Sequence, residues 1–286
     1  MVRFFLFLFV FTNILYANIN VVVSVLPEKT FVEAIGGDKV DISLMVKPGN
    51  SPHTYEPKPS QMKSISQADL YFSIDVEFEH VWLKRFSNQN KDMKIVDVSK
   101  GISKINISSI HHHKDNAKKE NKDPHIWTSP SNVKIIARNI YTALVEIDIK
   151  NKNYYKNNLD NFLLYIDQTN NDIKNILKNI PIDTKFMVFH PAWGYFAKEY
   201  NLIQLPIEVE GKSPKPKALK YLIDEAREEK VKAIFTQPEF SPKVANQIAN
   251  ELNIKVIKTT PLDPNWKENL IKLSKAISWS YSKVSK

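Results

Sequence analysis

The sequence predicts an α/β fold of two lobes, each with a mainly parallel sheet flanked by helices, joined by one long rigid helix. Short β-branched runs alternate with amphipathic helical segments in both halves, which is typical of βαβ units. One uninterrupted helical pattern, Tyr154–Ile180, separates the two halves. The chain is long enough for one large domain or for two of ordinary size.

The first half, which we assign to an N-terminal lobe at 18–150, alternates strand and helix signals. Strands are expected at Asn20–Val25, Ile42–Val46, Leu70–Ile74 and Lys94–Val98. Helices are expected at Lys29–Ile35, Pro59–Gln67 and Glu79–Ser87. A further helix, capped by Ser131, is expected to run to about Ile147. Parallel strands joined by helices place the loops after their carboxyl ends at one edge of the sheet. His53 follows the second strand and therefore belongs to that edge.

The segment Tyr154–Ile180 is expected to form the connector, to which we assign residues 151–181. Its apolar residues recur at intervals of three and four, as on one face of a helix: Leu159, Phe162, Leu163, Ile166, Ile173, Ile176 and Leu177. At the rise of an α-helix this segment would be about 40 Å long, which is more than one domain needs. We therefore expect a rigid connector between the lobes.

The second half, a C-terminal lobe at 182–286, repeats the alternation. Strands are expected at Lys185–Phe189, Leu202–Ile207, Val231–Thr236 and Lys255–Thr259. Helices are expected at Ala192–Tyr200, at Lys215–Glu229, after Ser241-Pro242 and from Trp266 onward. His190 directly follows the first of these strands, and Asp263 follows the last.

Residues 1–17, MVRFFLFLFVFTNILYA, have the features of a cleaved signal peptide. A cationic start at Arg3 leads into an apolar run that is too short for a comfortable membrane span. No other segment is long and apolar enough to span, and no cysteine near the cut could carry a lipid. We expect a periplasmic protein that does not span the membrane.

The formal net charge of +9 does not indicate a nucleic-acid partner. Only four of the 40 basic residues are arginine, whereas phosphate and base recognition depends on the planar fork of arginine. The lysines are dispersed among asparagines, as on a solvated surface. The six glycines form no phosphate-binding loop.

Three histidines each stand beside a proline. They occur as Pro52-His53, Pro124-His125 and His190-Pro191. Proline fixes φ and removes a hydrogen-bond donor, so each imidazole is expected on a stiff loop, where proteins usually present ligands. Because the chain has no cysteine, imidazole and carboxylate would have to hold any transition metal. The residues come from both halves, so the site is expected in the cleft between the lobes.

Such a set suits Zn²⁺, which commonly takes four ligands. His53, His125 and His190 supply three nitrogens, and Asp263 or water supplies the fourth position. Copper and nickel would bind the same donors, and an ordinary hydrogen-bonded loop histidine is the alternative for each residue taken singly. Acids that could orient the imidazoles through their free N–H groups are Glu56, Glu79, Glu208, Glu210 and Glu239.

The remaining histidines are expected to have lesser roles. His80 lies on a predicted helix and is expected to be structural. His111, His112 and His113 lie in the polar segment 99–123, which is predicted to be a mobile loop. Three consecutive imidazoles cannot all face one ion, so this loop is expected to bind metal weakly, with a simple polar linker as the alternative.

Several blocks of the sequence resemble the zinc-binding protein of bacterial zinc uptake ABC transporters, part of the solute-binding proteins for zinc and manganese. In collinear order these are SVLP (24–27), GNSPHTYEPKPSQ (49–61), DPHIWTSP (123–130), FHPAWGYFAKEYNL (189–202), EGKSPKPKAL (210–219), KAIFTQPEFSP (232–242) and TTPLDP (259–264). The resemblance implies two lobes on one long helix and zinc ligands at His53, His125 and His190. Manganese members usually have glutamate in the place of His190. Asp263 lies in a block that supplies a fourth ligand in some members only.

This chain differs from the family pattern at two places. The histidine-rich loop before the second ligand is short and contains more lysine than acid. Gln237-Pro238-Glu239 stands where zinc members often have Glu-Pro-Gln.

We therefore expect a monomeric periplasmic carrier, not an enzyme, that binds Zn²⁺ and delivers it to an ABC permease in the inner membrane. One alternative is a manganese or iron carrier, or a metal-binding adhesin, on the same scaffold. Another is a zinc hydrolase, since three histidines and an open position could activate water. No glutamate follows a ligand in a helical catalytic motif, which argues against the hydrolase.

Overall fold

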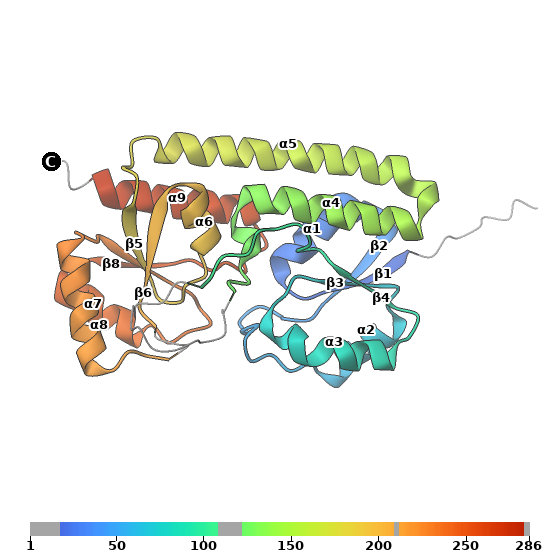
Figure 1. The fold of residues 1–286 in the computed structure, drawn as a ribbon, viewed down its shortest axis with the longest axis horizontal. Helices are drawn as coiled ribbons and strands as arrows, with labels where there is room; N and C mark the ends of the chain where they lie inside the picture. The colour runs from blue at the N-terminus through green and yellow to red at the C-terminus, as the bar shows by residue number, and fades with distance from the viewer. Residues whose placement is uncertain (1–17, 108–121, 209–211, 283–286) are drawn as a thin grey trace, which may run out of the picture.

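The computed structural model describes residues 18–107, 122–208 and 212–282 and has the predicted two-lobed α/β architecture (Figure 1). Each lobe contains a four-stranded sheet whose strands are all parallel. The predicted signal peptide at 1–17 and His111, His112 and His113 lie outside the described residues. Within the described ranges, no helix combines the length and the apolar character that a membrane crossing requires.

The sheet of the N-terminal lobe has the strand order β2-β1-β3-β4. Its elements are β1 (Ile19–Val23), α1 (Leu26–Gly36), a 3₁₀ turn (Gly37–Lys39), β2 (Val40–Leu44), α2 (Pro59–Gln67), β3 (Leu70–Ser73), α3 (Glu77–Gln89) and β4 (Lys94–Asp97). In β1, Val21 lies opposite Ile42 on one side and Leu70 on the other. The first connection therefore leads to one side of β1 and the next connection leads to its other side. The loops at such a switch point are where α/β sheets bind ligands.

The sheet of the C-terminal lobe has the order β6-β5-β7-β8, the same arrangement with β5 in the place of β1. Its elements are β5 (Thr184–Val188), α6 (Gly194–Glu199), β6 (Leu202–Pro206), α7 (Pro216–Glu228), β7 (Ala233–Thr236), α8 (Lys243–Leu252), β8 (Lys255–Lys258) and α9 (Trp266–Ser282). The carboxyl half of β5 is buried, and the chain runs from it directly to His190. His190 therefore lies at the switch point of the second sheet.

The long helix α5 (Lys152–Leu177) has 26 residues, which corresponds to a length of about 39 Å. It follows α4 (Pro130–Ile147) and a 3₁₀ turn (Ile149–Asn151). It packs on α1 and α4 from the first half of the chain and on α9 from the second, and it runs along both lobes (Figure 1). The predicted connector is confirmed, although the helix ends at Leu177 rather than at Ile180.

The cap of α4 differs from the prediction. Ser129, not Ser131, caps this helix, because Ser129 Oγ accepts the Asn132 N–H at 3.2 Å. Pro130 occupies the first helical position, where its missing N–H is not needed. Ser131 lies inside the first turn and donates through Oγ to Glu199 of α6 at 2.6 Å. The start of α4 is therefore tied to the C-terminal lobe.

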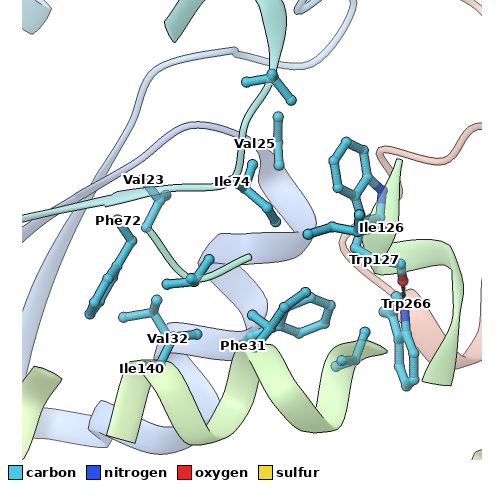
Figure 2. Close-up of a cluster of buried hydrophobic side chains, with 14 of the residues drawn as sticks. Val23, Val25, Phe31, Val32, Phe72, Ile74, Ile126, Trp127, Ile140 and Trp266 are labelled. Carbon is cyan, nitrogen blue, oxygen red and sulfur yellow. Dashed lines mark hydrogen bonds between the residues drawn. The ribbon is translucent and has the colours of Figure 1, made fainter. Parts of the chain in front are cut away.

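One apolar core continues through both lobes beneath α5. Phe31 of α1 contacts Phe162 of α5 and Trp266 of α9, in each case with 5.7 Å between ring centroids. Trp266 Nε1 donates to the carbonyl of Trp127 at 2.7 Å (Figure 2), and Trp127 Nε1 donates to Pro261 O at 2.8 Å. The lobes are thus joined by shared side-chain packing as well as by the long helix.

The segment 99–123 is hydrogen-bonded where the structure describes it. Asn106 and Lys122 form an antiparallel bridge, and Asp123 N–H donates to Ile105 O at 2.9 Å. Both ends of the predicted mobile loop are therefore anchored to the protein.

Two acids are buried beside the carboxyl ends of β1 and β3. Glu79 accepts backbone N–H groups of residues 74–76 at 2.7 to 3.2 Å and the hydroxyl of Ser24. Burial raises the pKa of Glu79 to about 7 although these donors oppose the rise. Burial also raises the pKa of Glu28, and the neighbouring charge of Glu79 adds to this effect.

The unfolding free energy of the metal-free protein should depend on pH through the ionisation of Glu79. Its pKa is 4.5 in the unfolded chain and about 7 in the fold, so the fold retains a proton that the unfolded chain loses. The resulting contribution is full below about pH 4.5 and is lost as the pH rises through about 7, a change of about 3 kcal/mol. In urea denaturation we expect the wild type to lose this stability relative to Glu79→Gln over that range. A difference between the two proteins that does not vary with pH would contradict the assignment.

Candidate metal centre

Three histidines from distant parts of the chain meet between the lobes. His53 lies in the loop after β2, His125 precedes the 3₁₀ turn Ile126–Thr128, and His190 lies two residues after β5. One ring nitrogen of each lies within 4.8 Å of the others. His190 Nε2 is 3.0 Å from His53 Nε2 and 3.4 Å from His125 Nε2. The structure therefore brings together the three histidines that the sequence singled out.

A carboxylate stands behind each imidazole. The pairs joined at Nδ1 are His53–Glu77 at 2.7 Å, His125–Asp123 at 2.7 Å and His190–Glu208 at 2.8 Å. An ionised carboxylate can only accept a hydrogen bond, so each Nδ1 carries the proton and donates it. In a neutral imidazole the other nitrogen is then unprotonated. Nε2 of each ring thus faces the other two rings and offers a lone pair there whenever its imidazole is neutral.

Two of the three acids are placed by the ends of regular elements. Glu77 is the first residue of α3, and Glu208 lies two residues after β6, where its N–H donates to Phe189 O at 3.1 Å. Asp123 Oδ1 accepts both the backbone N–H of His125, at 2.9 Å, and its Nδ1–H. Each of the three imidazoles is thus oriented by a carboxylate whose own position is set by the fold.

The centre is unequally exposed. His125 and His190 are buried, whereas the side chain of His53 retains 26% of its exposure. Burial lowers the pKa of His190 and outweighs the opposing effect of Glu208. Burial also acts to lower the pKa of His53, but the hydrogen bond and charge of Glu77 raise it overall. The centre therefore opens to solvent on the side of His53.

A hollow of about 20 Å³ lies against the three rings. A space of this size holds one ion or one water molecule and no organic substrate. Its other lining residues are Ser51, Pro52, Gln237, Glu239, Phe240, Pro261 and Leu262. The ring of Phe240 stacks on that of His190, with 4.9 Å between centroids.

Two of the three nitrogen separations are close to those around a tetrahedral ion. Zinc–nitrogen bonds of about 2.0–2.1 Å at tetrahedral angles place ligand nitrogens about 3.3–3.4 Å apart. The two Nε2 separations, 3.0 and 3.4 Å, lie within a few tenths of an ångström of that value. The three rings, which each have a nitrogen within 4.8 Å of the others, could therefore close around an ion of this kind.

Asp263 is not part of this group, which among the described residues contains only the three histidines. Its Oδ1 accepts the backbone N–H of Asn265 at 2.9 Å, in the turn that leads into α9. His80, expected to be structural, lies on the surface of α3 with 63% of its side chain exposed, and its Nε2 is 2.7 Å from Asp75.

Of the acids behind the imidazoles, the sequence reasoning named Glu208 and missed Glu77 and Asp123. The Asp-Pro-His spacing was a usable signal for Asp123, because a carboxylate two residues before a histidine can reach both its N–H and its Nδ1. Glu77 has no local signal, since it is far from His53 in the sequence. Glu79, another acid that the sequence suggested, accepts backbone N–H groups instead.

Known proteins match the chain over most of its length. The profile of the ZnuA family, described as "Zinc-uptake complex component A periplasmic", matches residues 21–278. The chain is 30% identical over 247 residues to the "High-affinity zinc uptake system protein ZnuA" of Bacillus subtilis, covering 83% of this chain and 76% of that protein. It is 30% identical over 234 residues to the "Manganese ABC transporter substrate-binding lipoprotein PsaA" of Streptococcus pneumoniae, covering 78% of this chain and 73% of that protein. A crystal structure of ZnuA matches with a TM-score of 0.84 at 39% identity, covering 91% of this chain and 98% of that one. The chain belongs to the ZnuA family of metal ABC transporter substrate-binding proteins.

Proposed function

We propose that this protein captures Zn²⁺ between its lobes and delivers it to an ABC permease. His53, His125 and His190 would bind the ion through Nε2. The convergence of the three ring nitrogens, with Nε2 separations of 3.0 and 3.4 Å, is the observation that carries the proposal. Two lone pairs at such a distance repel each other unless a proton or a metal cation lies between them, and the three carboxylates behind the rings supply negative charge that favours a cation there.

The donor set favours zinc as the cargo. Imidazole nitrogen suits zinc, whereas manganese prefers carboxylate and water oxygen. The fourth position would be taken by water, because the carboxylate of Asp263 accepts a hydrogen bond from the backbone N–H of Asn265. A manganese or iron carrier, or a metal-binding adhesin, on the same scaffold is the alternative, since relatives named for zinc and for manganese both match the chain.

Two of the proposed ligands share one rigid frame. His190 belongs to the C-terminal lobe, and the segment of His125 is fixed to that lobe by Tyr195, whose hydroxyl donates to Asp123 O at 2.9 Å. Of the three, only His53 lies on a loop that follows a strand of the N-terminal sheet. Because α5 packs on both lobes, we propose that small movements of the His53 loop, rather than wide hinge closure, admit and release the ion.

A zinc hydrolase on the same ligands has less support. It would need a general base beside the metal-bound water. Glu77, Asp123 and Glu208 accept hydrogen bonds from the ligand imidazoles, which leaves Glu239 as the one acid among the residues that line the hollow. Family membership also favours transport over catalysis. We therefore propose a monomeric periplasmic binding protein without enzymatic activity.

Replacing any one of the three histidines by alanine should weaken zinc binding by more than about 100-fold, since even the partners behind a ligand are worth about 10–100-fold. The measurement is zinc content after dialysis, followed by titration against a chromogenic chelator. We expect about one tightly held ion per wild-type chain, and His80→Ala, a surface change, should behave as the wild type does. Tight zinc that persists in all three variants would place the site elsewhere.

The same titration with Mn²⁺ as competitor tests the choice of metal. The three-nitrogen set should retain Zn²⁺ against a large excess of Mn²⁺, because manganese gains little from imidazole donors. Displacement of zinc by an equal concentration of manganese would establish the manganese carrier instead.

Asp263→Ala should leave zinc affinity within about three-fold of the wild type, because this carboxylate is bonded to backbone outside the histidine group. Loss of that bond should lower the unfolding free energy by about 1 kcal/mol. A ten-fold or greater loss of zinc affinity would show that Asp263 coordinates the ion in the loaded protein.

Deletion of His111–His113 should remove only weak binding. Adjacent imidazoles on a polar segment cannot converge on one ion, so the tight site should keep its affinity while any additional, weaker zinc is lost. Isothermal titration of the deletion variant beside the wild type would show this directly. If tight binding disappeared, the assignment to His53, His125 and His190 would be wrong.

A further inference from the structure

Gly194, the first residue of α6, lies against Asp123, the acid behind His125. A Cβ at Gly194 would lie 2.5 Å from Asp123 Oδ2, 3.1 Å from Gln204 Nε2 and 3.2 Å from Ile105 Cδ1. The first distance is far shorter than a van der Waals contact. The backbone conformation does not require glycine here, because φ of Gly194 is not positive. Glycine is therefore needed at this position for space.

Asp123 has little freedom to move away from an added methyl group. Its side chain is fully buried, and Oδ1 accepts the N–H and the Nδ1–H of His125 at 2.9 and 2.7 Å. Its backbone is fixed as well, since the N–H donates to Ile105 O at 2.9 Å and the carbonyl accepts the Tyr195 hydroxyl at 2.9 Å. Displacing this carboxylate would break the bond that orients His125.

Gln204, on the other side of Gly194, is also held in place. Its Oε1 accepts the Trp193 N–H at 3.0 Å, and its Nε2 donates to Pro191 O at 3.4 Å. An added methyl group would thus meet hydrogen-bonded side chains on both sides. Either the carboxylate of Asp123 or helix α6 itself would have to move to make room for it.

We propose that Gly194 is a positioning residue for His125 and acts through Asp123. The missing side chain of Gly194 leaves room for the carboxylate of Asp123. That carboxylate accepts the Nδ1–H of His125 and so keeps Nε2 directed at the ion. The consequence for zinc affinity rests on the proposed function, whereas the consequence for the tautomer does not.

A double-mutant cycle of Gly194→Ala and Asp123→Ala in the full chain tests this proposal. Each single change should weaken zinc binding by about 10–100-fold, which is the usual effect of losing the partner behind a ligand. The double variant should bind no more weakly than Asp123→Ala alone, because the methyl group then meets no carboxylate. Wild-type affinity in Gly194→Ala, or additive losses in the double variant, would overturn the proposal.

Gly36→Ala is the matched control. Its Cβ would lie 2.5 Å from a methyl carbon of Val40, outside the metal centre, and its φ is not positive. This variant should lower the melting temperature without changing zinc affinity. If Gly194→Ala does not fold, recovery of folding in the double variant would identify Asp123 as the obstacle. Failure of both variants to fold would overturn the proposal.

A measurement on metal-free protein separates this inference from the proposed function. The ring nitrogen signals of His125 in ¹⁵N NMR should show a protonated Nδ1 in the wild type and in Gly36→Ala, but not in Gly194→Ala. If this holds while the wild type binds no zinc, the proposed function fails and the positioning role stands. If zinc binding needs all three histidines but Gly194→Ala changes neither the affinity nor the His125 signals, the inference fails alone.

Discussion

The hydrogen bond from Nδ1 of an imidazole to a carboxylate is the interaction on which the metal centre depends, and it occurs three times. It fixes the tautomer and the ring direction together, so that Nε2 of each neutral imidazole is unprotonated and faces the centre. For His53 and His190 the bond also requires two separate elements to converge, a loop after one strand and a second segment that carries the acid. Parallel strands, whose carboxyl ends meet at one sheet edge, provide this convergence in both lobes.

The two sheets, whose carboxyl edges lead into the histidine loops, must also stay at a fixed distance from each other. Phe31, Phe162 and Trp266 pack across the lobe boundary, and burial of a large apolar side chain contributes about 1.5–3 kcal/mol. With α5 packed on both lobes, wide separation would expose this shared core. The loop that carries His53 is less constrained, since residues 47–50 are exposed and Gly49 has φ of +82°. Movement of a single ligand is therefore easier in this fold than movement of a whole lobe.

The sequence was most informative where the determining signal is local. The strands were predicted to within about two residues because β-branched runs and turn residues lie next to each other in the chain. The neighbouring prolines likewise singled out His53, His125 and His190. Glu77 and Gly194 could not be found in this way, because their roles depend on contacts with residues distant in the sequence. For Asp263 the sequence indicated the loop after the last strand, but it could not indicate that the carboxylate accepts the backbone N–H of Asn265.

The reversed order of Gln237-Pro238-Glu239 has a chemical basis in this structure. Gln237 accepts the His190 N–H at 3.4 Å through Oε1 and donates to His190 O at 3.0 Å through Nε2. An ionised glutamate at 237 would have no proton to donate and would place a buried charge against a carbonyl oxygen. The acid lies instead at Glu239, half-buried at the lining of the hollow, where burial raises its pKa. The uncharged amide therefore holds the backbone of His190, while the ionisable group lies beside the space that an arriving cation would enter.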